Sequence, residues 1–125
     1  MKIVKFILCL LFGLMFINAG LNKFFQYMPM PELSAEQLEL YEAMAKLKWI
    51  TPLTGVIEIV GGLLFIFPRT RALGAIVILP VMVGIVAHNL TFEPGGLVVA
   101  LPLLLINLWI IWDNSAKYSV LLQKE

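Results

Sequence analysis

Four stretches of the chain are almost continuously apolar, and short groups of polar or helix-breaking residues separate them. They cover residues 3–25, 50–67, 72–90 and 95–112. A helix needs about 20 mostly apolar residues to cross the hydrocarbon core of a bilayer, and each stretch comes near that length. Soluble helices carry a polar face, which these stretches lack almost completely. The pattern therefore predicts an all-α integral membrane protein, a four-helix bundle that forms one domain over residues 1–125.

The residues between the stretches are typical of helix boundaries. Thr51 followed by Pro52 is a good helix start, because threonine caps the first turn and proline fits within it. The sequence Pro-Arg-Thr-Arg at residues 68–71 predicts a tight polar turn, and Glu-Pro-Gly-Gly at residues 93–96 breaks the chain again. Pro80 and Pro102 lie inside the third and fourth stretches, where they predict kinks.

The connection over residues 26–49 is the only long one. It begins with Met-Pro-Met-Pro at residues 28–31, which cannot be helical. Ser34 and Gln37 then form a capping-box pair, and the stretch up to Lys48 predicts a short amphipathic helix. Its apolar side carries Leu40, Met44 and Leu47. Two interpretations remain open: a helix lying at the membrane surface, or a lid or docking surface above a site between the spans.

Basic residues are distributed unevenly between the two ends of the predicted bundle. One end carries Lys2, Lys5, Arg69, Arg71, Lys117 and Lys124. The other carries Lys23, Lys46 and Lys48 beside Glu32, Glu36, Glu39, Glu42 and Glu93. Because lysine and arginine accumulate on the cytoplasmic side of membrane proteins, we expect both termini there and the 26–49 loop outside.

Composition supports the membrane assignment and argues against nucleic-acid binding and thiol exchange. Apolar residues make up 61% of the chain and charged residues 14%, against about 45–50% and 25% in soluble domains. The net charge of +1 gives no reason to expect a nucleic-acid partner. Cys9 is the only cysteine, so the chain has no cysteine pair for thiol exchange. We expect Cys9 to be a small buried side chain.

Small and polar residues share one stripe on each predicted span. Examples are Gly13 and Gly20 on the first, Gly55, Glu58 and Gly62 on the second, and Gly84 and His88 on the third. Small residues let helix backbones approach closely within lipid. We therefore expect this stripe to face the other helices and the large apolar residues to face lipid.

Polar groups at membrane depth are the candidate site. An ionisable side chain in a span costs about 2.5–3.5 kcal/mol on insertion scales, so each needs an explanation. Counting residues from the span ends places Glu58 and Asn18 in one tier of the outer half, with a shallower tier above them. The shallower tier contains Asn22, Lys23, His88 and Asn89. These six residues are the predicted ligand-binding set.

Glu58 is the most informative of the six residues. It is either neutral or paired with Lys23 or His88, and the sequence leaves this open. Hydrogen bonds between helices, or Lys23 reaching to the headgroups, would also account for these residues. A single histidine excludes a haem with two histidine ligands and a histidine-rich metal site. We predict no catalytic and no metal-ligating residue, and a protein that is not an enzyme on its own.

The chain resembles DoxX-like membrane proteins. The likeness lies in FGLMFINAGLNKFF at residues 12–25, YMPMP at 27–31 and EIVGGLL at 58–64. It continues with Leu79-Pro80, His88 and EPGG at residues 93–96. The resemblance implies a four-helix protein of the bacterial inner membrane with a redox-associated, accessory role. The residues that it carries over are Asn22, Lys23, Glu58 and His88, none of them an established catalytic residue of that family.

These observations lead to three functional hypotheses. The first is an accessory protein that binds a small amphipathic molecule, such as a quinone, at the outer polar cluster. Its partners would be membrane lipid and a membrane or periplasmic oxidoreductase. The second is a structural or docking subunit without ligand chemistry. The third is a small transporter, which would be oligomeric because four spans are few for a pathway.

Overall fold

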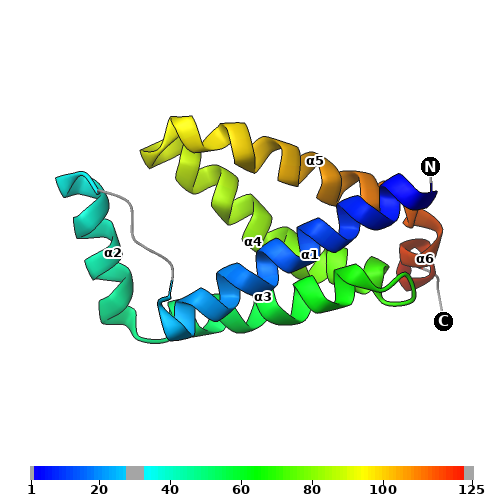
Figure 1. Cartoon of the computed structure of the whole chain (residues 1–125), viewed down its shortest axis with the longest axis horizontal. Coiled ribbons are helices and arrows are strands. Elements are labelled where there is room, and N and C mark those ends of the chain that lie inside the picture. The colour runs from blue at the N-terminus through cyan, green and yellow to red at the C-terminus, as the bar shows by residue number, and fades with distance from the viewer. Residues whose placement is uncertain (1, 28–32, 123–125) are drawn as a thin grey trace.

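The computed structural model describes residues 2–27 and 33–122, and all regular structure within them is helical (Figure 1). The four long helices are α1 (Lys2–Phe25), α3 (Ile50–Ile66), α4 (Arg71–Phe92) and α5 (Leu97–Asp113). The shorter ones are α2 (Ala35–Leu47), η1 (Pro94–Gly96), α6 (Ser115–Ser119) and η2 (Val120–Leu122). The non-helical run predicted over residues 28–31, Glu32 and Lys124 lie outside the described residues.

The long helices confirm a multi-pass membrane protein of the all-α class. α1, α4 and the η1–α5 segment are each long and apolar enough to cross a bilayer. α3 has 17 residues, which rise about 26 Å and lie at the lower end of the usual range. A longer apolar segment results only if α2 and α3 are counted together, and these two helices are bent by 89° relative to each other. The described residues thus provide three spans, or four when α3 is counted.

Glycine residues bring α1 and α3 into close contact along most of their lengths (Figure 1). A Cβ atom added at Gly62 would lie 2.6 Å from the carbonyl oxygen of Gly13. One added at Gly20 would lie 2.6 Å from the carbonyl oxygen of Gly55. Neither distance is compatible with a real side chain, so the predicted small-residue stripe does pack these two helices.

The bundle opens toward one end. α4 packs against both α3 and α5, whereas α1 and α5 contact each other little. Figure 1 shows the α1–α3 pair separating from α5 in the direction of α2. Gly84 on α4 lies in this open region, and nothing comes within 4 Å of the position of its missing Cβ. Gly84 therefore faces the cavity between the helices but does not pack closely against one of them, because α4 diverges from α1 there.

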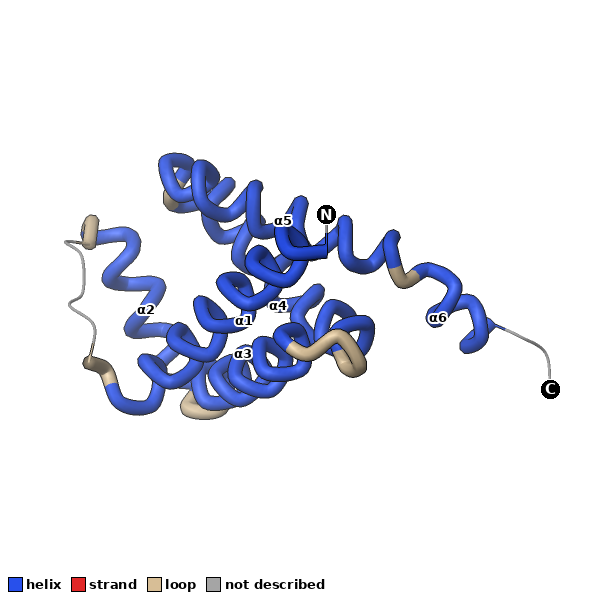
Figure 2. The backbone as a smooth tube through the Cα atoms, turned by 45° about the vertical axis from the view of Figure 1, so that its right-hand side comes forward, coloured by secondary structure: helices blue, strands red, loops and turns tan. Residues whose placement is uncertain are grey.

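The opposite end of the bundle is held together by polar contacts. Lys5 forms an ion pair with Asp113, which joins α1 to α5. Arg71 donates from Nε to the Phe65 carbonyl and from Nη2 to the Ile66 carbonyl, each at 3.0 Å. These bonds satisfy carbonyls that have no partner within α3. Both described chain ends lie here, and α6 projects away from the bundle (Figure 2).

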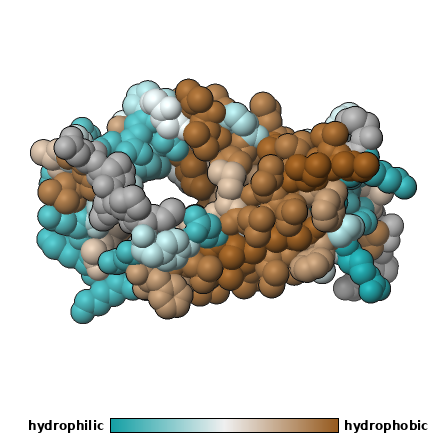
Figure 3. Space-filling model, viewed as in Figure 1, coloured by the Kyte–Doolittle hydropathy of each residue, from teal (hydrophilic) through white to brown (hydrophobic). Residues whose placement is uncertain are grey.

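The core lies just inside this closed end. The rings of Phe12 and Phe65 are stacked with their centroids 4.2 Å apart, which joins α1 to α3. Cys9 is fully buried in the same cluster, as predicted. Most other large apolar side chains are exposed on the outside of the bundle, where lipid would contact them (Figure 3).

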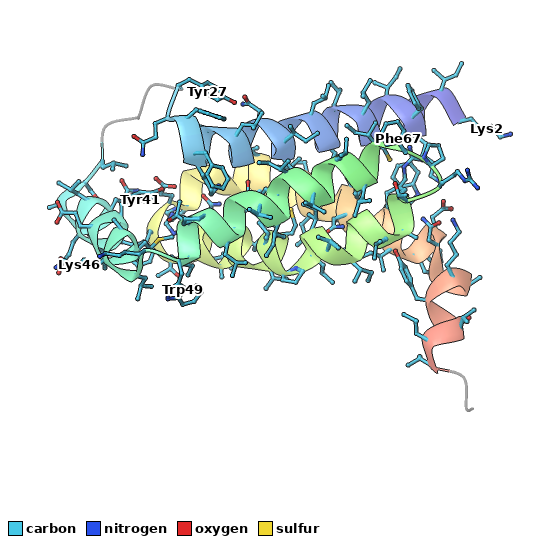
Figure 4. All side chains as sticks on the ribbon, turned by 90° about the horizontal axis from the view of Figure 1, so that it is seen from below. Lys2, Tyr27, Tyr41, Lys46, Trp49 and Phe67 are labelled. Atoms are coloured by element: carbon cyan, nitrogen blue, oxygen red, sulfur yellow. The ribbon has the colours of Figure 1, made fainter. Side chains whose placement is uncertain are left out.

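α2 stands across the open end of the bundle. The predicted capping box is present: Gln37 N donates to Ser34 Oγ at 3.2 Å, and Ser34 N donates to Gln37 Oε1 at 3.1 Å. The helix ends at Leu47, and the φ of 64° at the next residue, Lys48, turns the chain toward α3. No residue of α2 is fully buried. Figure 4 shows Tyr41 on the side of α2 toward the bundle and Lys46 on the opposite side.

Candidate functional site

A cavity of about 540 Å³ fills the open end of the bundle beneath α2. α1, α3 and α4 form its walls, and Tyr41 and Met44 of α2 face it from above. In the space-filling view an opening separates the polar α2 region from the apolar bundle (Figure 3). Most of the lining is apolar, and its main polar groups are Lys23, Glu58 and His88. Three of the six predicted site residues therefore meet at one cavity.

Lys23 and Glu58 form an ion pair at the base of this cavity. Lys23 Nζ lies 2.5 Å from Glu58 Oε1. The Glu58 side chain is only 3% exposed, whereas that of Lys23 is 29% exposed. The pair can form because Gly20 and Gly55 hold the two backbones together one turn away. Of the alternatives left open by the sequence, Glu58 therefore takes Lys23 as its partner.

His88 lines the cavity from α4 but forms no hydrogen bond with the Lys23–Glu58 ion pair. Its Nε2 lies 3.6 Å from Glu93 Oε2, which is longer than a hydrogen bond. This nitrogen is buried and has no hydrogen-bond partner among the described residues. The ring lies beside Phe92, with centroids 5.5 Å apart, and 6.2 Å from the ring of Tyr41. His88 thus brings to the cavity wall a ring nitrogen without a hydrogen-bond partner among the described residues.

Glu93 connects α2 to the end of α4. Gln37 donates from Nε2 to Glu93 Oε1 at 2.8 Å, and the same nitrogen lies 3.4 Å from the Phe92 carbonyl. Burial, and to a smaller extent the carboxylate of Glu93, raises the pKa of Tyr41 above its ordinary value. The Tyr41 phenol therefore stays protonated near neutral pH and can donate a hydrogen bond.

Tyr41, Gln37 and Glu93 were missed by sequence reasoning. Gln37 and Glu93 already had local explanations, as a capping residue and as part of a turn. The helical periodicity of residues 35–47 indicates which side chains share a face, but not what that face covers. No signal in the sequence locates α2 above the cavity.

The three predicted asparagines do not line the cavity. Asn18 is exposed on α1, where its side chain and carbonyl accept from the Tyr27 hydroxyl. Asn22 is half-buried in the last turns of α1. Asn89 is buried, and its Nδ2 donates to the Ile85 carbonyl at 2.8 Å within α4. Asn18 shares a depth with Glu58, but it points away because adjacent residues on a helix face different directions.

Comparisons with known proteins give one family. A family model described as "Methylamine utilisation protein MauE" matches residues 1–93. A Bacillus subtilis (strain 168) protein described as "Uncharacterized protein YwoB" is 32% identical over 68 residues. This alignment covers 54% of the chain and 44% of that relative, so the chain spans less than half of the relative's length. No solved structure matches.

The match to MauE overturns the resemblance to DoxX-like proteins. The shared features were an Asn-Lys pair ending the first helix, a glutamate before two glycines, and a proline-glycine turn. Each of these serves general needs of a membrane bundle, namely interfacial anchoring, close packing and chain reversal. Their order along the chain was therefore not specific for DoxX-like proteins.

Proposed function

The chain belongs to the MauE family of methylamine utilisation proteins, and from this premise we propose that it is an accessory membrane protein whose cavity binds a small amphipathic molecule. It would act within a methylamine utilisation system, beside an oxidoreductase in the membrane or periplasm. We assign the site to Lys23, Glu58 and His88, with Tyr41 above them. A quinone is the first ligand to test.

The cavity and its polar groups carry this proposal. Its volume of about 540 Å³ falls within the range of roughly 300–1,000 Å³ that is common for small-molecule sites. Such sites combine apolar walls with a few polar groups that orient the ligand. Lys23 and Tyr41 offer donors and His88 offers one nitrogen, so a flat molecule with oxygen acceptors would be held on more than one side.

Binding is proposed rather than catalysis by this chain alone. Glu58 and Lys23 neutralise each other at 2.5 Å, so neither is poised as a free base or nucleophile. Electron transfer to or from a quinone needs a redox centre, which a partner protein would supply. The role assigned to this chain is to hold the molecule at a defined depth.

We further propose that the protein lies in the bacterial inner membrane with the cavity in its outer half. The basic residues at the closed end, Lys2, Lys5, Arg69 and Lys117, support a cytoplasmic location for that end. The cavity and α2 would then face the periplasm.

Ligand binding can be tested with the purified protein in lipid nanodiscs. The double variant Glu58→Gln, His88→Ala should bind a short-chain benzoquinone at least ten-fold more weakly than the unsubstituted protein, because two polar contacts are lost. Asn18→Ala is the matched control, since Asn18 lies at a similar depth but outside the cavity wall. Equal affinity of the double variant and the control would reject the proposal.

A docking role is the second candidate, and the exposure of α2 favours it. Glu36, Glu39 and Glu42 are exposed, and α2 has no fully buried residue. A helix with so much of its surface exposed could present its acidic side to a basic partner. Isolation of the complex after gentle solubilisation would test this: a stoichiometric partner should be lost when residues 34–48 are deleted, and its retention would reject docking through α2.

A further inference from the structure

A second, smaller pocket lies deeper in the bundle than the main cavity. Its volume is about 110 Å³, and three of its walls are Met15, Phe16 and Leu103. The other three, Ala19, Glu58 and Ile85, also line the main cavity. The two pockets are therefore neighbours that meet at Glu58. Apart from the Glu58 carboxyl, every side chain of the inner pocket is apolar.

The inner pocket lies along the seam between α1 and α5. Lys5 and Asp113 join the two helices at the closed end, but the helices contact each other little and separate toward α2 (Figure 1). Met15 forms part of the α1 wall and is 47% exposed. It lies ten residues before the end of α1 at Phe25, or about 15 Å along the helix. At that depth an exposed side chain meets hydrocarbon, so the seam opens toward lipid.

The route from the aqueous side is more obstructed. α2 stands over the mouth of the main cavity, with Tyr41 and Met44 in its lining. The Gln37–Glu93 hydrogen bond at 2.8 Å holds the start of α2 to the end of α4, while the turn at Lys48 joins its other end to α3. A molecule dissolved in the membrane would meet no such cover at the seam.

From this geometry we infer that the ligand is a lipid-borne amphiphile whose apolar chain lies in the α1–α5 seam. Its polar head occupies the main cavity beside Lys23 and Glu58, and the first carbons of the chain pass Glu58 into the inner pocket. The inference rests on the proposed function and specifies its ligand class. The three walls that the two pockets share support the chain of the ligand itself as the occupant of the seam, rather than a separate bilayer lipid.

A pair of tryptophan substitutions on α5 tests the inference. Leu103→Trp fills the inner pocket, whereas Leu105→Trp places the same ring on the exposed side of the helix. The probes are a methyl-substituted benzoquinone and the same headgroup with a decyl chain, titrated against full-length protein in nanodiscs. Leu103→Trp should weaken binding of the decyl compound at least ten-fold and that of the methyl compound less than two-fold. Leu105→Trp should change neither affinity.

The outcomes separate this inference from the proposed function. If neither probe binds the unsubstituted protein, the proposed function and the inference both fall. If the methyl compound binds but Leu103→Trp leaves both affinities unchanged, or weakens both equally, the chain does not lie in the seam and only the inference falls. Thermal unfolding in the same nanodiscs verifies folding, and Leu103→Phe replaces Leu103→Trp if the larger ring prevents it.

Discussion

At the scale of single residues, the Lys23–Glu58 pair combines a buried acid with a partly exposed base. Moving a carboxylate out of water is costly, and a nearby ammonium group repays much of that cost. The pair lies at 2.5 Å with Glu58 almost fully covered. Lys23 extends from the last turn of α1, where its charged end can still reach the cavity and any water in it. Lys23 therefore borders the space that the proposed ligand would occupy.

Removing only the lysine should therefore destabilise the protein more than removing both charges. Lys23→Met leaves the Glu58 carboxylate unpaired and should lower the free energy of unfolding by about 3 kcal/mol. The double variant Lys23→Met, Glu58→Leu should recover most of that loss, since no buried charge remains. Denaturant unfolding in detergent micelles measures both effects.

Lys46→Met provides the control for this comparison. Lys46 is exposed on the side of α2 away from the bundle, so the same substitution there should change stability by less than about 0.5 kcal/mol. A double variant as unstable as Lys23→Met, or less stable, would contradict the role assigned to the pair.

At the scale of the helices, the bundle combines a close contact between α1 and α3 with a more open arrangement around α4. α1 and α3 approach through glycines on both sides, which leaves no room for a Cβ at Gly62. In contrast, α4 carries Gly84 and Pro80 on an exposed surface beside the cavity. The tight α1–α3 contact fixes the distance between Lys23 and Glu58, and the divergence of α4 and α5 leaves the cavity open.

Two glycine-to-alanine substitutions should distinguish these contacts. Gly62→Ala would press a methyl group against the Gly13 carbonyl at 2.6 Å and should cost about 1–3 kcal/mol, as overpacking does in protein cores. Gly84→Ala meets no atom within 4 Å and should gain up to about 1 kcal/mol, because alanine favours the helix. Unfolding measured in the same detergent compares the two; equal losses would mean that α4 packs more tightly than described.

At the scale of the whole molecule, the two ends differ in character. The end that carries both described chain ends is tied by the Lys5–Asp113 pair, by Arg71, and by the Tyr118 hydroxyl donating to the Ala72 carbonyl at 2.5 Å. The other end holds the cavity and α2. The cavity therefore lies at the end of the bundle away from both described chain ends, and α2 stands over it.

Cysteine labelling should reveal which side is which. In a Cys9→Ala background, a membrane-impermeant thiol reagent should label Glu39→Cys on intact cells, because residue 39 is exposed on α2. Ser119→Cys at the opposite end should react only after permeabilisation. Labelling of both positions from the same side would contradict the bundle, and the reverse pattern would invert the proposed orientation.

The predicted site agrees with the structure in depth but less well in direction. Lys23 belongs to the shallower tier, and its long side chain reaches the deeper Glu58 on the neighbouring helix. Asn18 has the right depth and points outward, whereas its neighbour Ala19 lines both pockets. One residue along a helix rotates the side chain by about 100°. Counting residues along a span predicts the depth of a side chain. It does not predict how the helix is rotated about its axis, and this rotation decides which side chain faces the cavity.

The sequence by itself determined the helices, their apolar character and the capping of α2, because hydrocarbon requires each span to satisfy its own backbone and a cap is a local arrangement. Only the tertiary structure decided the position of α2, the pairing of Glu58 with Lys23 and the exposure of Gly84. Those features depend on the tilt and rotation of helices around one another, which packing between distant parts of the chain sets.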